Sequence, residues 1–294
     1  MRFTKAVAIA LTLTWTFSTA LAQVTTSTIL GTVTDRSGAT IPDVRVTVKD
    51  VGTGFERVVT TGADGTYVVE NLKPGQYQVS ASKTGFNEKV ISGITVAVDQ
   101  RARIDVQLEV GAVTQRVEVQ GAAPVVETDS STVGKVITTR DVLELPLNGR
   151  NFIQLAVLTP GVQYYTVSYM EYTGGAISAN GMSAWSNVPM IDGIYNQDEG
   201  ASRMAFSPSI DLIQEFKIQT NVYDAEFGQS AGAQINILTK RGTNTYHGSA
   251  FEFLRNDNMD ARPYFQPGAL PHFSRNQFGG TFGGQIPRLK KDFF

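Results

Sequence analysis

The sequence contains no cysteine, and this absence excludes several kinds of chemistry. Without a thiol there is no disulfide, no cysteine nucleophile and no cysteine-ligated metal. Histidine is nearly absent as well, because His247 and His272 are the only two in 294 residues. Both lie towards the C-terminal end, so no Ser-His-Asp arrangement and no histidine metal site can be assembled. We therefore predict a protein that is not an enzyme and that has no cofactor.

Charged residues and long apolar helices are also scarce. Only 18% of the residues are charged, the net charge is −2 and the pI is about 5.8. This balance gives no basic face of the kind that nucleic-acid binding needs. Beyond the N-terminus no segment reaches the ~20 apolar residues of a spanning helix. If the chain enters a membrane, it must therefore do so as β-strands.

The N-terminus indicates a secretory signal peptide over residues 1–22. Its apolar core covers residues 6–17, which is short for an uncleaved membrane anchor, the alternative reading of this segment. The positive start and the A-x-A cleavage site are carried by Arg2, Lys5, Ala20, Ala22 and Gln23, of which Gln23 would begin the mature chain.

Residues 23–112 alternate between apolar and polar positions, as in residues 44–49, where three valines alternate with Arg, Thr and Lys. Turn signals separate the alternating runs, for example at residues 36–38 and 73–75. Period-two alternation broken by turns is typical of half-buried antiparallel strands. About seven such strands at this spacing predict a β-sandwich.

Several runs in this segment resemble the carboxypeptidase-regulatory-like domain, at residues 30–35, 39–44, 61–67 and 72–77. The resemblance implies a transthyretin-like, carbohydrate-binding-like sandwich. It implies no peptidase activity, because the segment has no histidine to hold a catalytic zinc. A surface that binds glycan or peptide stays open as an alternative, although we expect Tyr67 and Tyr77 to pack in the core.

Residues 125–244 change to a mixed α and β pattern. Proline stops and polar caps mark the helix ends, and alternation marks the strands. The predicted elements are a helix over 140–145, a buried helix over 152–158 that Asn151 can cap, a helix beginning at Ser207-Pro208, a strand and turn over 188–195, and strands over 215–220 and 234–239.

Two motifs in this region resemble the plug domain of TonB-dependent outer-membrane receptors, specifically of the Oar-like subfamily. Their residues are Asn148, Gly149, Arg150 and Asn151 in the first motif, and Ile191, Asp192 and Gly193 in the second. Further matching pieces follow in the same order, at residues 158–162, 178–181, 213–216, 223–228 and 242–244. The resemblance implies an α+β plug domain over residues 125–244.

Residues 113–124 form a linker between the predicted sandwich and plug. Receptors of this family carry a short valine-rich box ahead of the plug, which TonB pairs with as an added strand. The candidate box is Arg116, Val117, Glu118, Val119 and Gln120. A last strand of the sandwich, or a plain linker, is an equally open reading of these five residues.

Residues 245–294 are predicted to begin a transmembrane β-barrel. In residues 276–286, Phe278, Phe282 and Ile286 fall on one side, whereas Gln277 and Thr281 fall on the other. Alternation over about ten residues is typical of barrel strands. Since such barrels close about 22 strands, we expect the sequence to be the N-terminal part of a longer receptor or a truncated reading frame.

The fold class expected from these segments is mainly β: a sandwich, an α+β plug and the first strands of an incomplete barrel. The resemblance implies an outer-membrane receptor for energy-coupled uptake, with sandwich and plug on the periplasmic side or in the lumen. The implied partners are TonB with its inner-membrane energising complex, and an unidentified ligand such as carbohydrate or peptide. The alternative is a secreted or surface binding protein that uses the sandwich.

Overall fold

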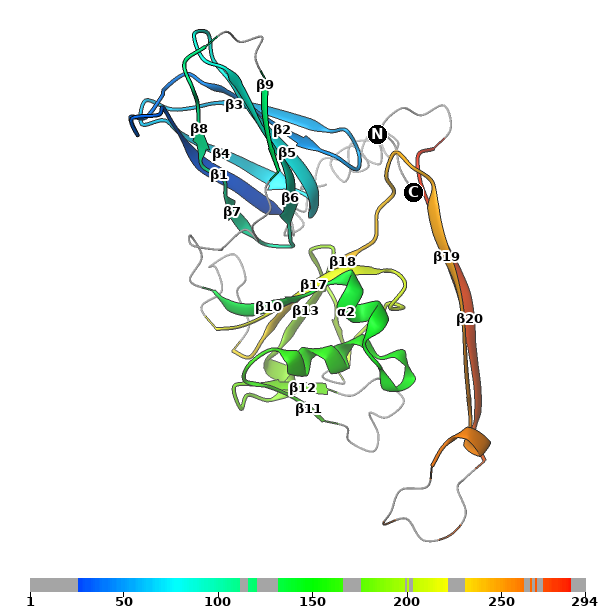
Figure 1. Cartoon of the computed structure of the whole chain (residues 1–294). Coiled ribbons are helices and arrows are strands. Elements are labelled where there is room, and N and C mark those ends of the chain that lie inside the picture. The colour runs from blue at the N-terminus through cyan, green and yellow to red at the C-terminus, as the bar shows by residue number, and fades with distance from the viewer. Residues whose placement is uncertain are drawn as a thin grey trace, which may run out of the picture.

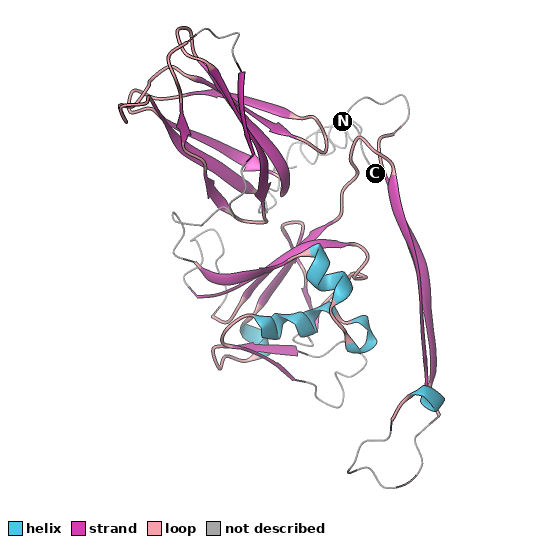
Figure 2. Ribbon diagram, viewed as in Figure 1, coloured by secondary structure: helices cyan, strands magenta, loops and turns pink. Residues whose placement is uncertain are grey.

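The computed structural model describes residues 26–111, 116–120, 132–165, 176–198, 200, 203–221, 231–261, 265, 268 and 272–286. Figure 1 shows three parts: a β-sandwich, a mixed α and β region, and a long hairpin that runs beside the mixed region. Strands dominate all three parts and helices are short (Figure 2). The predicted fold class, mainly β with a sandwich first, is therefore confirmed.

Two sheets make the sandwich. Its strands are β1 (Ser27–Thr34), β2 (Arg45–Asp50), β3 (Glu56–Thr60), β4 (Thr66–Leu72), β5 (Gly75–Ser82), β6 (Glu88–Val96), β7 (Arg101–Arg103), β8 (Val106–Gln107) and β9 (Arg116–Gln120). One sheet has four strands in the order β4-β1-β7, with β8 also paired to β1. The other has five strands in the order β3-β2-β5-β6-β9. The structure thus has more strands than the seven that the turn spacing predicts, and one of them, β9, lies beyond residue 112, where the predicted sandwich ends.

The sandwich core forms because alternate residues of each strand point inwards. In β1 every second residue is buried, which matches the period of a pleated strand. Val46 and Val79 from one sheet belong to the same buried cluster as Ile29 and Val33 from the other. Tyr67 and Tyr77 are buried in this cluster, as predicted.

The mixed region is built on a five-stranded sheet in the order β10-β17-β18-β13-β14. Its elements are β10 (Val133–Ile137), α2 (Thr139–Glu144), η1 (Asn148–Arg150), η2 (Phe152–Leu158), β11 (Val162–Tyr165), β12 (Ala176–Ala179), η4 (Ala184–Ser186), β13 (Val188–Ile191), β14 (Ile194–Tyr195), β15 (Gln197–Asp198), β16 (Arg203–Met204), β17 (Ile213–Asn221) and β18 (Gln234–Thr239). Strands β13 and β18 are parallel, and the other pairs in this sheet are antiparallel.

Helices cover one side of this sheet, with the β11–β12 hairpin beyond them (Figure 2). Phe152 from η2 and Phe216 from β17 meet edge to face, with ring centroids 5.4 Å apart. Both are buried in the second hydrophobic cluster together with Ile218 and Ile237. This side of the sheet is therefore an apolar core, and the sandwich lies on the other side (Figure 1).

Side-chain caps explain the starts of two of the helices, and of these only the cap at Asn151 was predicted from the sequence. Thr138 and Asp141 form a capping box at the start of α2. The Asn151 side chain accepts a hydrogen bond from the Ile153 N–H at the start of η2, which is a 3-10 helix. The helix predicted to begin at Ser207-Pro208 is wrong, because residues 207–212 form irregular structure and a turn before β17.

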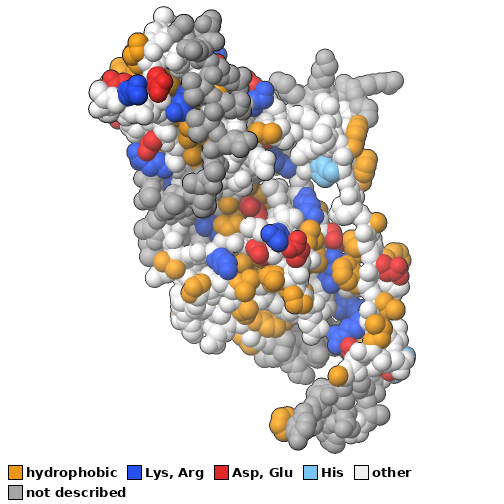
Figure 3. Space-filling model, in the orientation of Figure 1, with side chains coloured by type: hydrophobic (Ala, Val, Ile, Leu, Met, Phe, Trp, Pro, Cys, Tyr) orange, Lys and Arg blue, Asp and Glu red, His pale blue; other side chains and the backbone are white. Residues whose placement is uncertain are grey.

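The hairpin consists of β19 (His247–Asn256) and β20 (Ser274–Gly283), with η5 (Asp257–Met259) at the end of β19. Ten residue pairs run without a register shift from His247↔Gly283 to Asn256↔Ser274. The register places Phe278 and Phe282 on one face and Gln277 and Thr281 on the other, as predicted. Hydrophobic side chains run along the hairpin in Figure 3. Within the part of the chain that the structure describes, no helix is long and apolar enough to cross a membrane.

Candidate functional site: the contact between plug motif and hairpin

The first plug motif forms a tight turn between α2 and η2. Gly149 and Arg150 have φ values of +66° and +57°, in the left-handed region. Such a turn is easy for glycine and costs other residues about 1 kcal/mol or more. Asn148 and Gln154 brace the turn with two hydrogen bonds, of 3.1 Å from the Asn148 N–H and 3.0 Å to its carbonyl oxygen. The turn therefore presents the Arg150 side chain in a fixed direction.

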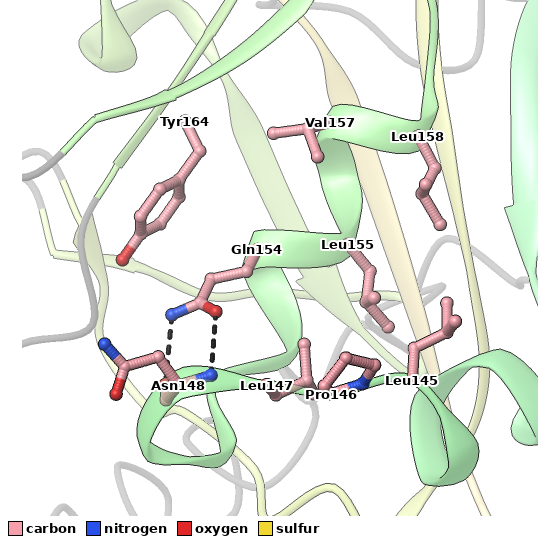
Figure 4. Close-up of a pocket in the computed structure, with 9 residues that line it drawn as sticks. All are labelled: Leu145, Pro146, Leu147, Asn148, Gln154, Leu155, Val157, Leu158 and Tyr164. Atoms are coloured by element: carbon pink, nitrogen blue, oxygen red, sulfur yellow. Dashed lines mark hydrogen bonds between the residues drawn. The ribbon is translucent and has the colours of Figure 1, made fainter. Parts of the chain in front are cut away.

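A shallow hollow of about 510 Å³ lies beside this turn. Figure 4 shows its lining, which is mostly aliphatic and includes Leu145, Pro146, Leu147, Val157 and Leu158, with Asn148, Gln154, Leu155 and Tyr164 completing the wall. The Asn148–Gln154 hydrogen bonds form its polar edge (Figure 4). The hollow is open and carries no cluster of ionisable groups, so we assign it no chemistry.

Arg150 connects the plug motif to two other parts of the chain. Its Nη2 lies 2.5 Å from Oδ2 of Asp211, which also accepts a hydrogen bond from Ser209 at 3.0 Å. The guanidinium carbon is 4.2 Å from the ring centroid of Phe251 and 4.0 Å from that of Phe253. A planar cation over aromatic faces is attracted by the ring quadrupoles. Arg150 therefore joins the mixed region to the first strand of the hairpin.

Asn148 adds a second bond between the same two parts. Its Oδ1 accepts a hydrogen bond from Nη1 of Arg255 at 2.8 Å. Gly149 lies close to Arg275, since a Cβ placed there would be 3.2 Å from Nη1 of that arginine. Figure 3 shows Lys and Arg side chains gathered where the plug meets the hairpin. The motif predicted from the sequence thus faces residues of β19 and β20 that sequence reasoning did not connect with it.

The second motif has a different position and a structural role. Asp192 and Gly193, with φ of +49° and +81°, turn the chain between β13 and β14. The Asp192 carboxylate accepts from the Thr239 N–H at 3.0 Å and from its hydroxyl at 2.7 Å. Ile191 pairs with Ile237 in the parallel β13–β18 ladder. This motif fixes the end of β18 and does not touch the Arg150 contact.

The candidate TonB box, residues 116–120, forms β9. It runs parallel to β6, from Glu88↔Arg116 to Ser92↔Gln120, at the edge of the five-stranded sheet. The structure thus has these residues as a last strand of the sandwich, which is one of the readings that the sequence left open. The cleavage-site residues Ala20, Ala22 and Gln23, and the matching piece at 223–228, lie outside the described residues.

One ionisable group with a raised pKa, Glu215, lies where the mixed region contacts the sandwich. Burial raises the pKa of Glu215 to about 7, while a hydrogen bond from the Val98 N–H and the charge of Lys217 oppose that rise. In the ranges that the structure describes, no three His, Cys, Asp or Glu side chains gather as a metal site. Sequence reasoning missed Glu215, because its alternation with Phe216 looks like an ordinary solvent-facing position.

Comparison with known proteins defines the class of the chain. Residues 28–109 match the carboxypeptidase regulatory-like domain, and residues 238–294 match an outer membrane beta barrel domain. The chain therefore combines a regulatory-like sandwich with an outer-membrane barrel region, and the outer membrane is its location. Most of the segment that resembles a plug, residues 125–244, lies between these two matches.

Within that class the chain is similar to the TonB-dependent transporter Oar of Myxococcus xanthus, with 31% identity over 94% of this chain. The match confirms the resemblance to Oar-like TonB-dependent receptors. The chain spans about a quarter of that relative, 27% of its length. Two solved structures are also similar: the siderophore receptor PirA from Acinetobacter baumannii (23% identity, TM-score 0.40, 56% of this chain and 24% of that one) and the transporter YddB from Escherichia coli (18%, 0.37, 43% and 19%).

Proposed function

We propose that the chain acts in TonB-dependent uptake across the outer membrane. In this proposal residues 116–120 are the strand that TonB pairs with, the mixed region is the plug, and β19–β20 belong to the barrel wall. TonB, energised by its inner-membrane complex, would pull on the linker and loosen the plug. No covalent chemistry is needed, and the ligand would be a carbohydrate, a peptide or another large or scarce compound.

The Arg150 contact is the observation that supports this proposal most directly. A plug must be held by the wall that surrounds it. Arg150 provides such a hold, because it is paired with buried Asp211 and stacked on Phe251 and Phe253 of β19. On the opposite face of the hairpin Phe278 and Phe282 are exposed, as lipid-facing barrel residues would be.

Disulfide capture can test the role of residues 116–120, because the chain has no cysteine of its own. Val119→Cys would be incubated with single-cysteine variants of the host's TonB periplasmic domain. Val58→Cys is the matched control, since Val58 lies on β3 at the opposite edge of the same sheet. We expect a cross-linked product with the cysteine at position 119 and little with the one at 58. Equal capture at both, or none at 119, would contradict the assignment.

The alternative, a glycan- or peptide-binding sandwich, has less support. Tyr67 and Tyr77 are buried, so they form no aromatic platform for a sugar. Phe55 is exposed, with the Arg57 guanidinium 5.7 Å from its ring centroid. Glycan-array binding by residues 23–112 that is lost in Phe55→Ala would favour this alternative.

A further inference from the structure

The side of the plug sheet that faces away from its apolar core carries a row of polar residues on β17. Glu215, Lys217 and Gln219 alternate with Phe216 and Ile218, so they share the opposite face. Lys217 is only 3% exposed and Gln219 only 1%. A lysine this buried is unfavourable unless a partner compensates its charge.

The partner is a turn of the sandwich between β6 and β7, residues 97–100. Its Val98 N–H donates to the Glu215 carboxylate. The Asp99 carbonyl oxygen accepts from Nζ of Lys217 at 2.7 Å, and the Asp99 carboxylate accepts from Nε2 of Gln219 at 2.7 Å. The same carboxylate lies 3.9 Å from the Lys217 ammonium. One turn therefore contacts all three polar side chains of the row.

The sandwich itself fixes the shape of this turn. Asp99 has φ of +54°. The Gln100 side chain accepts from the Ala97 N–H at 2.8 Å, and the Ser27 hydroxyl donates to the Ala97 carbonyl at 2.6 Å. Because these bonds lie within the sandwich, the turn does not depend on the plug for its conformation. It is a preformed surface that fits the row on β17.

A second contact lies where the plug leads into the hairpin. Nη2 of Arg241 is 2.8 Å from the Asp50 carboxylate and 3.1 Å from the Pro74 carbonyl oxygen. Asp50 is 3% exposed. The Asn244 N–H donates to the Gly52 carbonyl at 2.9 Å. Residues 241–244 lie within the connection from β18 to β19, so the sandwich also holds the segment that leads out of the plug.

We propose that the sandwich is a detachable clamp on the plug, held by the 97–100 turn on β17 and by Asp50 on Arg241. The proposal rests on the proposed function, since it describes how the regulatory-like domain would control plug movement. The contacts are few and polar, and interfaces of this kind between domains permit relative motion. When the clamp is closed, β17 and the plug exit are held in place. When it opens, both are released together.

A nicked chain can test the clamp without TonB or transport. A site for a specific protease is inserted within residues 121–131, and the purified full chain is cut in detergent. We expect the two pieces to remain associated during gel filtration at micromolar concentration. Lys217→Met would weaken their association by roughly 100-fold, because it leaves the mostly buried Asp99 carboxylate without its cation.

Two further variants make the result decisive. Asp99→Asn keeps the turn, because asparagine tolerates a positive φ, and we expect it to weaken association by at least tenfold. Lys49→Met is the matched control, since Lys49 pairs with Glu56 at a half-exposed site, and it should leave association unchanged. Separation of the wild-type pieces, or wild-type association in both Lys217→Met and Asp99→Asn, would overturn the proposal. Capture by TonB at position 119 is measured separately, so failure of the clamp is distinguishable from failure of the proposed function.

Discussion

Arg150 and Asp211 form an ion pair of 2.5 Å in which both side chains are almost buried, with exposed fractions of 12% and 9%. The two residues are 61 positions apart. The pair lies beneath the hairpin, because the Arg150 guanidinium also stacks on Phe251 and Phe253. Arg150 thus neutralises Asp211 and also holds β19. We therefore expect its loss to destabilise both the plug and the hairpin.

Replacing Arg150 by alanine should destabilise the plug by about 3–5 kcal/mol, since breaking a buried pair leaves one charge uncompensated. Urea unfolding monitored by tryptophan fluorescence would measure this loss. Arg150→Lys should recover only part of it, because lysine lacks the planar group that stacks on the rings. Arg140→Ala is the control. Arg140 pairs with Glu144 on an exposed helix surface, where such pairs contribute about 0.5 kcal/mol or less. An equal effect of both alanine variants would disprove the special role of Arg150.

The association of sandwich and plug should depend on pH through Glu215. Its pKa is raised from 4.5 to about 7 when the sandwich covers it, mainly by burial. A raised pKa means that the closed clamp binds the proton more tightly than the open one. The resulting stabilisation is complete below about pH 4.5 and is lost as the pH rises through about 7.

Dissociation constants of the nicked chain between pH 4.5 and 8 would reveal this dependence. We expect weaker association with rising pH and a plateau above about pH 7. Glu215→Gln keeps an acceptor for the Val98 N–H but cannot ionise, so its profile should be nearly flat. If the wild-type pieces instead associate more tightly as the pH rises, the predicted direction of the pH dependence is wrong.

Gly31 in β1 should not tolerate a side chain. A Cβ there would lie 2.0 Å from the Ile104 carbonyl oxygen and 2.6 Å from its carbon, both of them backbone atoms. Gly31→Ala should therefore force β1 away from the segment after β7 and cost about 1–3 kcal/mol or more. Gly52→Ala is a suitable comparison, because its Cβ would meet neighbours only at 3.4 Å. Thermal unfolding of both variants would test this, and we expect a lower melting temperature for Gly31→Ala than for Gly52→Ala. Equal melting temperatures would refute the expectation.

Asp192→Ala should loosen the end of β18 without unfolding the plug. The substitution removes two hydrogen bonds to Thr239, each with a net contribution of about 1–2 kcal/mol. Hydrogen exchange at the Thr239 amide should accelerate by at least tenfold, while that at Ile235, inside the same strand, should change little. In Asp192→Asn, the exchange rate of the Thr239 amide should lie between the rates in the wild type and in Asp192→Ala. Asparagine keeps an oxygen acceptor and tolerates the left-handed turn.

The sequence predicted the sandwich well because its strands are half-buried, and a half-buried strand shows its pleat as alternation. It also predicted the cap at Asn151, which depends on a neighbour only two residues away, but it did not predict the capping box at Thr138. The helix predicted at Ser207-Pro208 failed because a proline and a serine cap are local preferences, and the chain there turns directly into β17. Local sequence preferences alone cannot predict that the chain enters β17 here instead of forming a helix.

The contacts that matter most for function were not predictable in this way. Asp99 and Lys217 are 118 residues apart, and each alone has the pattern of an ordinary surface charge. Arg150 could be singled out as part of a motif, but nothing near it in the chain indicates Phe251 or Phe253. Contacts between residues so far apart in the sequence are determined by how whole domains pack. Such packing produces no periodic pattern in the sequence.

Strand β17 faces an apolar core on one side and the polar turn of the sandwich on the other. A shift of one residue would therefore exchange Phe216 with Lys217, placing an ammonium in the core and an aromatic ring against Asp99. Insertions or deletions within residues 213–221 should thus be far more harmful than changes of the same length in surface loops.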